Sequence, residues 1–393
     1  MGLMKSYIGR EHMLVAGSVC WECFENEGIQ NYIKENYNGK DCDYCSRENK
    51  SYDLSEVIDF VYSCLRDRYE NPANGMGYNS REGGYQGQTY DSHEILDEVG
   101  LGCDCSSLFE DVANNLPEAH WCKIDPYQLW PHEEVNYDWQ NFSNLLKHKC
   151  RFHFLHHGKK HDDYFSGEPK LLSSILEYIV DTFIECSIVK KIPVGHVFHR
   201  ARYFDENHPF DMVVGEIAPP PESLASSSRM SPAGIPMFYA AENLETALRE
   251  IKIEEGKSAV VAEFKNSIEL RVIDLTRLPS IPDIFDQYDV AEETGIRFIN
   301  DFKRDFVKVI NKDGKEHIEY VPTQVVSEYI KYNDDKFDGE VHGFAYPSSV
   351  TGDKAYCLFL DRYQCGVIKE GFFSNEESFV VDIVSDSIKK IVR

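Results

Sequence analysis

The sequence has no long hydrophobic run and no excess of positive charge. No stretch approaches 18 consecutive apolar residues, the length that identifies a membrane-spanning helix, so we expect no membrane span. The first residues, MGLMKSYIGREHM, lack the apolar run of a secretory signal, which predicts a cytoplasmic protein. Lys and Arg number 41 against 67 Asp and Glu, giving a formal charge of −26. This balance argues against a general nucleic-acid binder, because such proteins need clustered cations.

Twelve cysteines without a secretory signal favour reduced thiols or a metal site over a disulfide framework. Cys20-x2-Cys23 and Cys42-x2-Cys45 are separated by 18 residues. Each pair supplies two thiolates from one tight turn, and two such turns complete the tetrahedron of a structural Zn²⁺ site. A redox role would need a thioredoxin-like βαβ context, which is absent. We therefore expect zinc to stabilise the polar residues 1–50.

In the remainder of the chain, the hydrophobic pattern changes at Pro193. In SEVIDFVYSCLRDRYE, Val57, Phe60, Val61 and Cys64 have helical spacing, and LLSSILEYIVDTFIECSIVKKI also predicts a helix. After Pro193, short β-rich runs such as HVFHRARYF and KAYCLFLD alternate irregularly with helical segments. This pattern predicts an α+β fold built on antiparallel sheets. The predicted modules are a zinc segment at 1–50, a helical domain at 51–192 and an α+β domain at 193–393.

A locally basic stretch, LKHKCRFHFLHHGKK, lies at residues 146–160. Its Arg151-x4-His156 spacing resembles the signature of HEPN ribonucleases, which implies action on an RNA phosphodiester at a dimer interface. Two other interpretations stay open. The stretch is also compatible with a solvated helix end, and His157 and His161 have the i, i+4 spacing of a metal-binding pair.

The segment SSSRMSPAGIPMFYAAENLETALREI, residues 226–251, combines a turn, a strand and a helix. Pro232 and Gly234 suit the second and fourth positions of a type I turn beginning at Ser231, and 235–240 is typical of a strand. Asn243 is the expected helix N-cap. The apolar stripe of the helix comprises Leu244, Ala247, Leu248 and Ile251.

Two glutamates flank this stripe. Glu250 falls at one edge and Glu245 at the opposite edge. Periodicity alone does not decide which of them, if either, faces a ligand.

The neighbouring motifs place this segment in a wider pattern. VFHRAR and PPPESLASSSRMSPAG come before it, and YVPTQVVSEYI and FDGEVHGFAYPSSVTGDKAYCLFLD follow. Together they resemble the RES domain family over residues 193–393. The motifs CWECF, CDYC and SREGGYQG resemble the HEPN-type helical domain that precedes some RES domains. The resemblance implies an ADP-ribosyltransferase-like fold, action on NAD and a role as a toxin or defence effector. It also implies an inhibitory antitoxin or a sensor protein as partner, and a homodimer.

The resemblance extends to individual positions. The first arginine of the family matches Arg200, its second matches Arg229, its tyrosine matches Tyr239, its glutamate matches Glu250 and its serine matches Ser348. Ser349 is an alternative for that serine, and Arg202 alternates with Arg200 along the same strand. Two positions depart from the pattern, because Ser228 replaces a glycine and Ser231 an asparagine.

These residue types suit chemistry on NAD. The guanidinium groups of Arg200 and Arg229 can bind the pyrophosphate, and Tyr239 offers a flat face to the nicotinamide or its ribose. The carboxylate of Glu250 can stabilise the oxocarbenium-like ribose that forms when nicotinamide leaves, and Ser348 can bond the ribose or nicotinamide. Water, phosphate or a protein side chain is the acceptor. The alternatives are a HEPN ribonuclease and a non-enzymatic module that senses NAD or neutralises a toxin.

Overall fold

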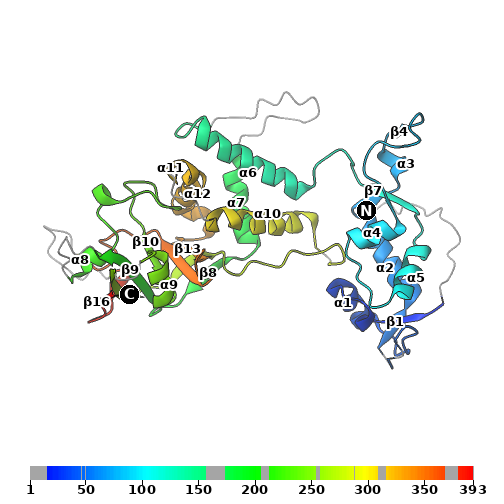
Figure 1. Cartoon of the computed structure of the whole chain (residues 1–393), viewed down its shortest axis with the longest axis horizontal. Coiled ribbons are helices and arrows are strands. Elements are labelled where there is room, and N and C mark those ends of the chain that lie inside the picture. Colours follow the sequence, from blue (N-terminus) through cyan, green and yellow to red (C-terminus); the bar gives the residue numbers. More distant parts are fainter. Residues whose placement is uncertain are drawn as a thin grey trace. The chain divides into compact units, whose positions relative to one another are not determined.

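The computed structural model divides the chain into two compact units, coloured along the sequence in Figure 1. The first unit combines Met1–Trp130 with Ile281–Glu293, and the second combines Pro131–Ser280 with Thr294–Arg393. Within the described residues, no helix is both long and apolar enough to cross a membrane. The structure describes residues 16–45, 47–48, 50–155, 173–204, 212–253, 257–286, 288–308, 316–367 and 379–392.

The first unit is mainly helical, with short strands between its helices. The side chains of Val57 and Val61 are fully buried on one face of its longest described helix, as the helical spacing predicts. Its elements are β1 (Ser18–Cys20), η1 (Trp21–Cys23), α1 (Glu27–Asn36), β2 (Ser51–Asp53), α2 (Leu54–Arg66), β3 (Tyr69–Glu70), α3 (Pro72–Gly75), β4 (Tyr78–Asn79), β5 (Gly84–Tyr85), β6 (Tyr90–Asp91), α4 (Ser92–Glu98), α5 (Ser106–Asn115) and β7 (His120–Lys123).

The residues around the four cysteines share one core with the helices that follow. Phe24 and Ile29 belong to the same buried cluster as Val57 and Leu65 of α2. β1 also pairs with β2 in an antiparallel ladder that aligns Cys20 with Ser51. The polar N-terminal segment therefore obtains its apolar core from residues beyond 50, which is why it does not form a compact unit of its own.

A segment from much later in the chain completes this core. Phe285 is buried in it, and a Cβ atom added to Gly28 would lie 2.7 Å from the backbone of Phe285. Only glycine therefore permits this close approach of the two backbones. Arg68 donates two hydrogen bonds to the buried carboxylate of Glu293, one of them 3.0 Å long. The segment 281–293 is consequently an integral part of the first unit.

The second unit is built on one large sheet, which in the described residues has nine strands. The strand order is β15-β11-β9-β10-β14-β13-β12-β8, with β16 paired to β11. Neighbours are antiparallel except β12 and β13, which confirms the predicted α+β fold with antiparallel sheets. The strands are β8 (Val189–Ile192), β9 (Val197–Phe204), β10 (Phe238–Ala241), β11 (Ser258–Asn266), β12 (Leu270–Asp274), β13 (Gly343–Pro347), β14 (Lys354–Leu358), β15 (Val381–Ile383) and β16 (Lys389–Val392).

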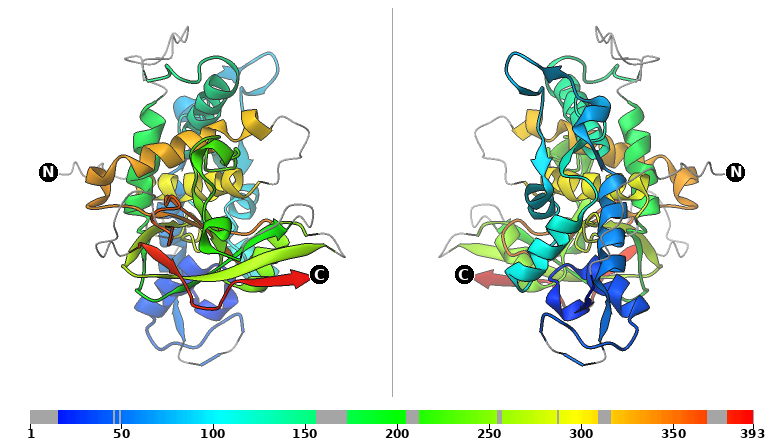
Figure 2. Two further views of the ribbon diagram at one scale, coloured as in Figure 1. Left: turned by 90° about the vertical axis from the view of Figure 1, so that its left-hand side faces the viewer. Right: turned by 90° about the vertical axis from the view of Figure 1, so that its right-hand side faces the viewer.

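Helices cover one face of this sheet (Figure 2). Phe142, Phe183 and Phe302 from three of them form a single core with Phe344 of β13. The compact division therefore lies at Trp130, because the helices at 131–185 bury their apolar faces against the sheet unit. The helices of this unit are α6 (Pro131–His148), α7 (Ser174–Glu185), α8 (Val214–Ile217), η2 (Glu222–Leu224), α9 (Leu244–Glu250), α10 (Val290–Val307), α11 (Glu316–Glu319), α12 (Val321–Lys331) and η3 (Asp334–Phe337). The first four residues of α10 belong to the first unit.

Candidate active site

The segment 226–251 forms the predicted turn, strand and helix, with one shift in register. The amide of Ile235 donates to the carbonyl of Pro232 at 3.1 Å, and Gly234 has φ of 87°. The turn therefore spans Pro232–Ile235 with glycine at its third position, and the type I turn predicted from Ser231 to Gly234 is wrong. A positive φ at the third position is typical of a type II turn and favours glycine.

The helix after the strand begins as predicted. The side chain of Asn243 accepts a hydrogen bond from the amide of Thr246 at 2.8 Å, so Asn243 is the N-cap of α9. The strand itself starts at Phe238, three residues later than the predicted start at Ile235. α9 ends at Glu250, which places that side chain at the last turn of the helix.

The structure separates the two glutamates of α9. The Oγ of Ser348 donates a hydrogen bond of 2.5 Å to Oε1 of Glu250. Glu245 instead pairs with Arg249 on the helix surface, at 2.6 Å. Ser348 lies directly after β13 and is buried, whereas Glu250 is exposed. An exposed carboxylate held in place by a buried hydroxyl is what a ligand-facing group requires.

The hydroxyl of Ser348 is oriented by its own loop. Its Oγ accepts a hydrogen bond from the amide of Val350 at 3.2 Å, which leaves its proton directed to Glu250. The next residue, Ser349, accepts a hydrogen bond of 3.1 Å from Nη2 of Arg229. Two adjacent serines thus bring together the carboxylate of Glu250 and the guanidinium of Arg229, although about 20 residues separate them in the sequence.

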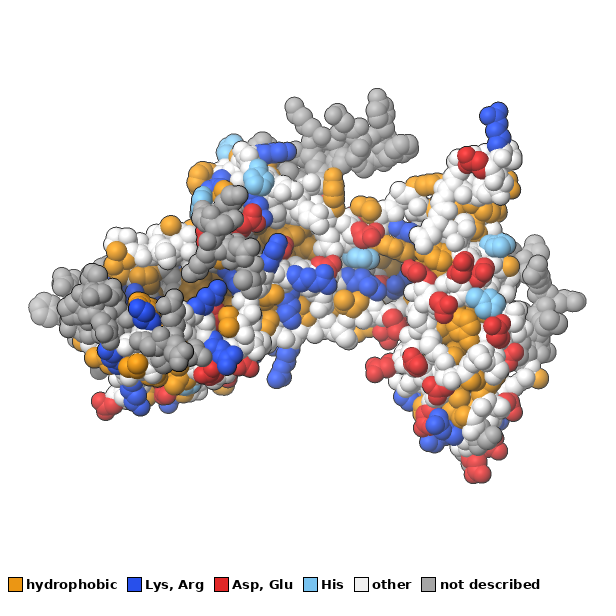
Figure 3. Space-filling view, viewed as in Figure 1, with side chains coloured by type: hydrophobic (Ala, Val, Ile, Leu, Met, Phe, Trp, Pro, Cys, Tyr) orange, Lys and Arg blue, Asp and Glu red, His pale blue; other side chains and the backbone are white. Residues whose placement is uncertain are grey.

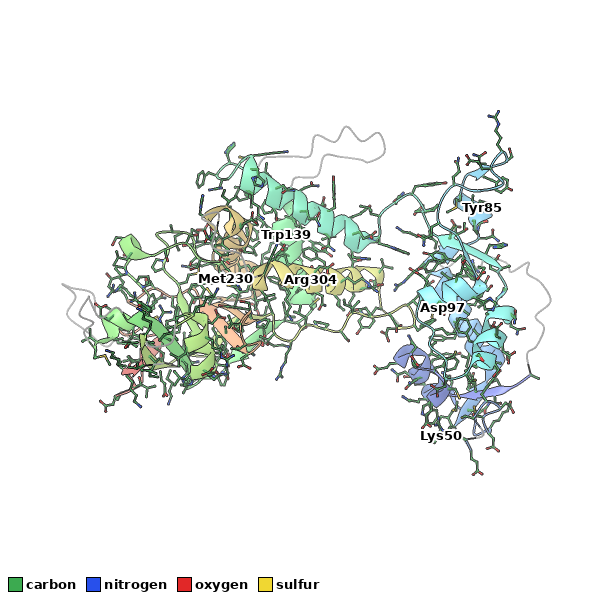
Figure 4. The ribbon with its side chains drawn as sticks, in the orientation of Figure 1. Lys50, Tyr85, Asp97, Trp139, Met230 and Arg304 are labelled. Atoms are coloured by element: carbon green, nitrogen blue, oxygen red, sulfur yellow. The ribbon has the colours of Figure 1, made fainter. Side chains whose placement is uncertain are left out.

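Arg229 lies in a loop that is anchored on both sides. Its Nη1 donates to the carbonyl of Phe306 in α10 at 3.3 Å, and its side chain is half-buried. The adjacent Met230, labelled in Figure 4, is fully buried in the core shared with the covering helices. The buried Met230 therefore fixes the backbone next to Arg229, and the bond to Phe306 helps to fix the guanidinium.

Tyr239 is linked to the same loop. Its hydroxyl lies 3.1 Å from Oγ of Ser231, the residue at the asparagine position of the family pattern. The ring packs against the core under the covering helices. Burial raises the pKa of Tyr239 well above its usual value, with the neighbouring Cys357 contributing further. The phenol is therefore neutral at physiological pH and acts as a hydrogen-bonding group.

Tyr346 is a neighbour that the sequence prediction missed. It precedes Ser348 by two residues, so it extends from the same side of the strand. Burial is the main cause that raises the pKa of Tyr346. The neighbouring Cys357 and the charge of Glu250 raise this pKa further, whereas the charge of Arg229 lowers it. Tyr346 therefore lies within electrostatic reach of both charged groups. The motif YPSS contained this signal, because alternate residues of a strand share a face.

Arg200 has a buried position that differs from that of Arg229. Its Nε donates to the carbonyl of Ile217 at 2.6 Å, and its Nη1 donates to the carbonyl of Tyr239. In this part of the described sheet, β9 and β10 pair only at His199 and Ala241. Beyond this pair the two strands separate, and the guanidinium of Arg200 in β9 bonds the backbone of β10 at Tyr239. Burial lowers the pKa of Arg200 to about 10, so the group stays protonated. It fastens β10 to β9 where the two strands separate.

Arg202 follows the same pattern. Its Nη1 donates to the carbonyl of Glu216, and burial lowers its pKa. Strand alternation places Arg200 and Arg202 on the side of β9 that carries Phe198, which belongs to a different core cluster from the one that Tyr239 contacts. The structure thus joins Glu250 to Ser348 directly and Arg229 to the adjacent Ser349, whereas Arg200 bonds the backbone of Tyr239.

Lys and Arg side chains gather on one face of the second unit. On the face viewed in Figure 3, Lys and Arg side chains form a row over the region of α10, whereas Asp and Glu side chains are frequent on the first unit. The formal charge of −26 is therefore unevenly distributed.

The four cysteines converge as their spacing predicts. The Sγ–Sγ distances are 3.6 Å for Cys20–Cys23, 3.4 Å for Cys20–Cys45 and 3.7 Å for Cys23–Cys42. A tetrahedron with Zn–S bonds of about 2.3 Å has S–S edges of roughly 3.8 Å. All four sulfurs lie within 4.8 Å of one another, and none is in a disulfide. The donor set and its spacing fit Zn²⁺.

Backbone amides favour the thiolate form of Cys42, whereas burial raises the pKa of Cys20 and of Cys23. Burial opposes ionisation of Cys42, but hydrogen bonds from the amides of Cys45, Cys20 and Tyr44 outweigh it and lower its pKa to about 7. The amide of Cys20 lies 3.4 Å from the Cys42 sulfur. Such N–H donors orient metal-binding thiolates and neutralise part of their charge.

The HEPN-like pair falls only partly within the described residues. Arg151 is half-buried just after α6. Nearby, Nζ of Lys147 pairs with Glu319 at 2.7 Å. His156, His157 and His161 lie outside the described residues, so both the R-x4-H pair and the histidine metal pair stay predictions.

Comparison with known families supports the architecture seen in the sequence. HEPN/RES N-terminal domain 1 matches residues 35–160, and the RES domain matches residues 193–370. The chain is a RES-domain protein with an N-terminal HEPN/RES domain. The RES match contains every residue of the candidate active site, from Arg200 to Ser348. Neither the curated proteins nor the solved structures gave a match to this chain.

Proposed function

We propose that this RES-domain protein consumes NAD by breaking the bond between nicotinamide and ribose, with Glu250 as the catalytic carboxylate. The RES domain indicates a toxin-like enzyme that acts on NAD. The observation that carries the proposal is the arrangement of Glu250 and Arg229 on the adjacent serines 348 and 349. A carboxylate and a guanidinium that bond two neighbouring serines suit the oxocarbenium-like ribose and the pyrophosphate of NAD.

Glu250 acts on the charge that develops at the ribose. When the C–N bond breaks, nicotinamide leaves as a neutral base with the bonding electrons, and C1′ of the ribose becomes oxocarbenium-like. The carboxylate stabilises this cation more than it stabilises the ground state, which lowers the barrier. Ser348 holds Oε1, so Oε2 is the oxygen directed to the ribose.

Arg229 binds the pyrophosphate. A guanidinium carries five N–H donors in a planar fork, and the contacts to Ser349 and Phe306 each engage one nitrogen. The remaining donors can form paired, charge-assisted hydrogen bonds with phosphate oxygens. Tyr239 would lie beside the nicotinamide ribose. Arg200 would act indirectly, because its hydrogen bond to the carbonyl of Tyr239 fixes the strand that carries the tyrosine.

The acceptor decides which enzyme class the protein belongs to. With water, C1′ gains a hydroxyl and a proton is released, giving ADP-ribose and nicotinamide. With phosphate the product is ADP-ribose phosphate, and with a protein side chain it is an ADP-ribosylated protein. An activity of this kind would be controlled by an inhibitory antitoxin, a sensor protein or a second copy of the chain.

The assay is release of free nicotinamide from NAD by the purified chain. It is run in water, with added phosphate and with candidate protein acceptors, and the ADP-ribose product is identified by mass. Nicotinamide should appear in at least one condition. If NAD stays intact in all of them, the proposed function is wrong.

Arg229→Ala should raise KM for NAD by on the order of tenfold to a hundredfold while changing kcat little. The pyrophosphate contact is made both before and during the reaction, so its loss weakens ground state and transition state alike. Arg249→Ala is the matched control, because that exposed arginine pairs with Glu245 instead. A KM equal to that of the wild type would exclude Arg229 from binding.

Arg200→Ala should reduce NAD binding and also lower the melting temperature. The substitution leaves the carbonyls of Ile217 and Tyr239 without their buried donor, which costs about 1–3 kcal/mol for each unsatisfied group. Thermal melting alongside the KM measurement separates the two effects. An unchanged melting temperature with a raised KM would instead favour direct contact between Arg200 and NAD.

For the cysteine cluster we propose one structural Zn²⁺ bound by Cys20, Cys23, Cys42 and Cys45. Four thiolates leave no open coordination position for substrate, so the metal would supply stability rather than chemistry. The fit of the four sulfurs to a tetrahedron supports this assignment.

A further inference from the structure

The loop that carries Arg229 has little structure of its own. Residues 225–237 contain neither helix nor strand. Within the stretch from Ser227 to Ser231, the amide of Ser228 donates to the carbonyl of Ser231 at 2.8 Å. The amide of Gly234 also closes the loop by donating to the carbonyl of Ala225 at 2.9 Å, and the turn at Pro232 adds a third bond, but none of these bonds involves Arg229 itself. The position of Arg229 must therefore depend on contacts with other elements.

Two buried side chains at the start of α12 supply these contacts. Oγ1 of Thr323 donates to the backbone carbonyl of Arg229 at 2.5 Å. Nε2 of Gln324 donates to the carbonyl of Ser228 at 2.7 Å and to Oγ of Ser227 at 2.9 Å, and lies 3.2 Å from the carbonyl of Ser231. Thr323 and Gln324 are 5% and 6% exposed, so water does not replace these donors.

The same helix is rigidly seated. Val326 and Ile330 of α12 are buried in the core shared with α10 and the sheet. The carbonyl of Phe306 in α10 accepts from the guanidinium of Arg229. α12 therefore holds the backbone of the loop while α10 and Ser349 hold the tip of the arginine. Ser231, which accepts from Gln324, also contacts the hydroxyl of Tyr239.

We propose that Thr323 and Gln324 are positioning residues that set the location of Arg229 for NAD binding. This inference rests on the proposed function of the site. Neither side chain touches the substrate. They bond the backbone carbonyls of Ser228, Arg229 and Ser231. Because these carbonyls accept from buried donors, the loop backbone around Arg229 loses conformational freedom. A loop fixed before binding avoids the entropy cost of ordering it around the ligand.

The first test is a matched pair at one position. Thr323→Val keeps the shape of the side chain but removes the hydroxyl, and Thr323→Ser restores it. Thr323→Val should raise KM for NAD about tenfold with kcat within about twofold, and Thr323→Ser should return KM to near the wild-type value. Gln324→Leu should raise KM further, because it leaves several buried acceptors without a donor.

A control and a double mutant exclude a merely structural role. Ser327→Ala removes another buried hydroxyl of α12, one that donates to the carbonyl of Thr323 within the helix at 2.9 Å, and should leave KM unchanged. In an Arg229→Ala background, Thr323→Val should raise KM no further, because its effect passes through Arg229. An additive increase, or a lower melting temperature with unchanged KM, would overturn the proposal.

The test stays informative if the proposed reaction is absent. Calorimetric titration with NAD measures the dissociation constant directly, without turnover. Weaker binding in Thr323→Val, rescued in Thr323→Ser, would support positioning even if no nicotinamide is released. Wild-type protein that neither binds NAD nor releases nicotinamide would contradict the function and the positioning role together, whereas normal binding by Thr323→Val would contradict the positioning role alone.

Discussion

Glu250→Gln should lower kcat for nicotinamide release by about a hundredfold or more while KM for NAD stays within about threefold. Glutamine keeps the size of the side chain and can still accept the hydrogen bond from Ser348. It loses only the negative charge that faces the oxocarbenium-like ribose. Because that charge matters far more in the transition state than in the bound substrate, turnover should fall much more than binding.

The same helix offers the control. Glu245→Gln removes an identical charge five residues earlier, where the carboxylate pairs with Arg249 on the surface. It should change kcat less than twofold, since an exposed ion pair contributes about 0–1 kcal/mol. Turnover is measured at saturating NAD, and thermal melting confirms that both variants are folded. Equal losses in the two variants, or full activity in Glu250→Gln, would remove Glu250 from the mechanism.

Replacing Cys20 and Cys23 together by serine should abolish metal binding and unfold the first unit. The purified wild-type chain should contain about one Zn²⁺, because one site uses both cysteine pairs. Structural zinc contributes on the order of 10 kcal/mol to folding in small zinc-finger domains. Cys20, Cys23 and Cys42 are buried in the same cluster as Leu54 and Trp121, so we expect the loss to spread beyond residue 50.

Elemental analysis of protein purified without chelator checks the metal, and hydrogen exchange across the first unit checks the unfolding. Cys105→Ser is the control, because Cys105 is not one of the four converging cysteines and lies at the N-cap of α5, where serine is a favoured residue. Wild-type protein without zinc would refute the metal assignment. Zinc retained in the double variant would refute the ligand set.

Local signals in the sequence predicted those parts of the fold that depend on local chemistry. The spacing of the cysteines and the cap at Asn243 are examples, because each depends on a few neighbouring residues. The choice between Glu250 and Glu245 needed the tertiary structure, since only the position of Ser348 distinguishes them. The sequence predicts a turn from Ser231 to Gly234, one residue before the turn in the structure, because Pro232 and Gly234 suit either a type I turn from Ser231 or a type II turn from Pro232.

The burial of Arg200 was also beyond the sequence. From the sequence alone, an arginine in a strand of alternating residues is equally compatible with binding a ligand and with bonding the backbone of a neighbouring strand. The second role follows from the divergence of β10 from β9, which is a property of strand pairing between distant segments. Likewise, the helices at 131–185 resemble those that precede them, and only packing assigns them to the sheet unit.

The return of residues 281–293 to the first unit sets an order of events during synthesis. The chain passes between the units after Trp130, after Ser280 and after Glu293, so the ribosome must deliver Phe285 before the first unit can close its core. By then β8 to β12 have emerged, but Thr323 and Ser348 have not. The N-terminal unit can thus be complete while the nascent chain still lacks the serine that holds Glu250, and competence for the reaction comes last.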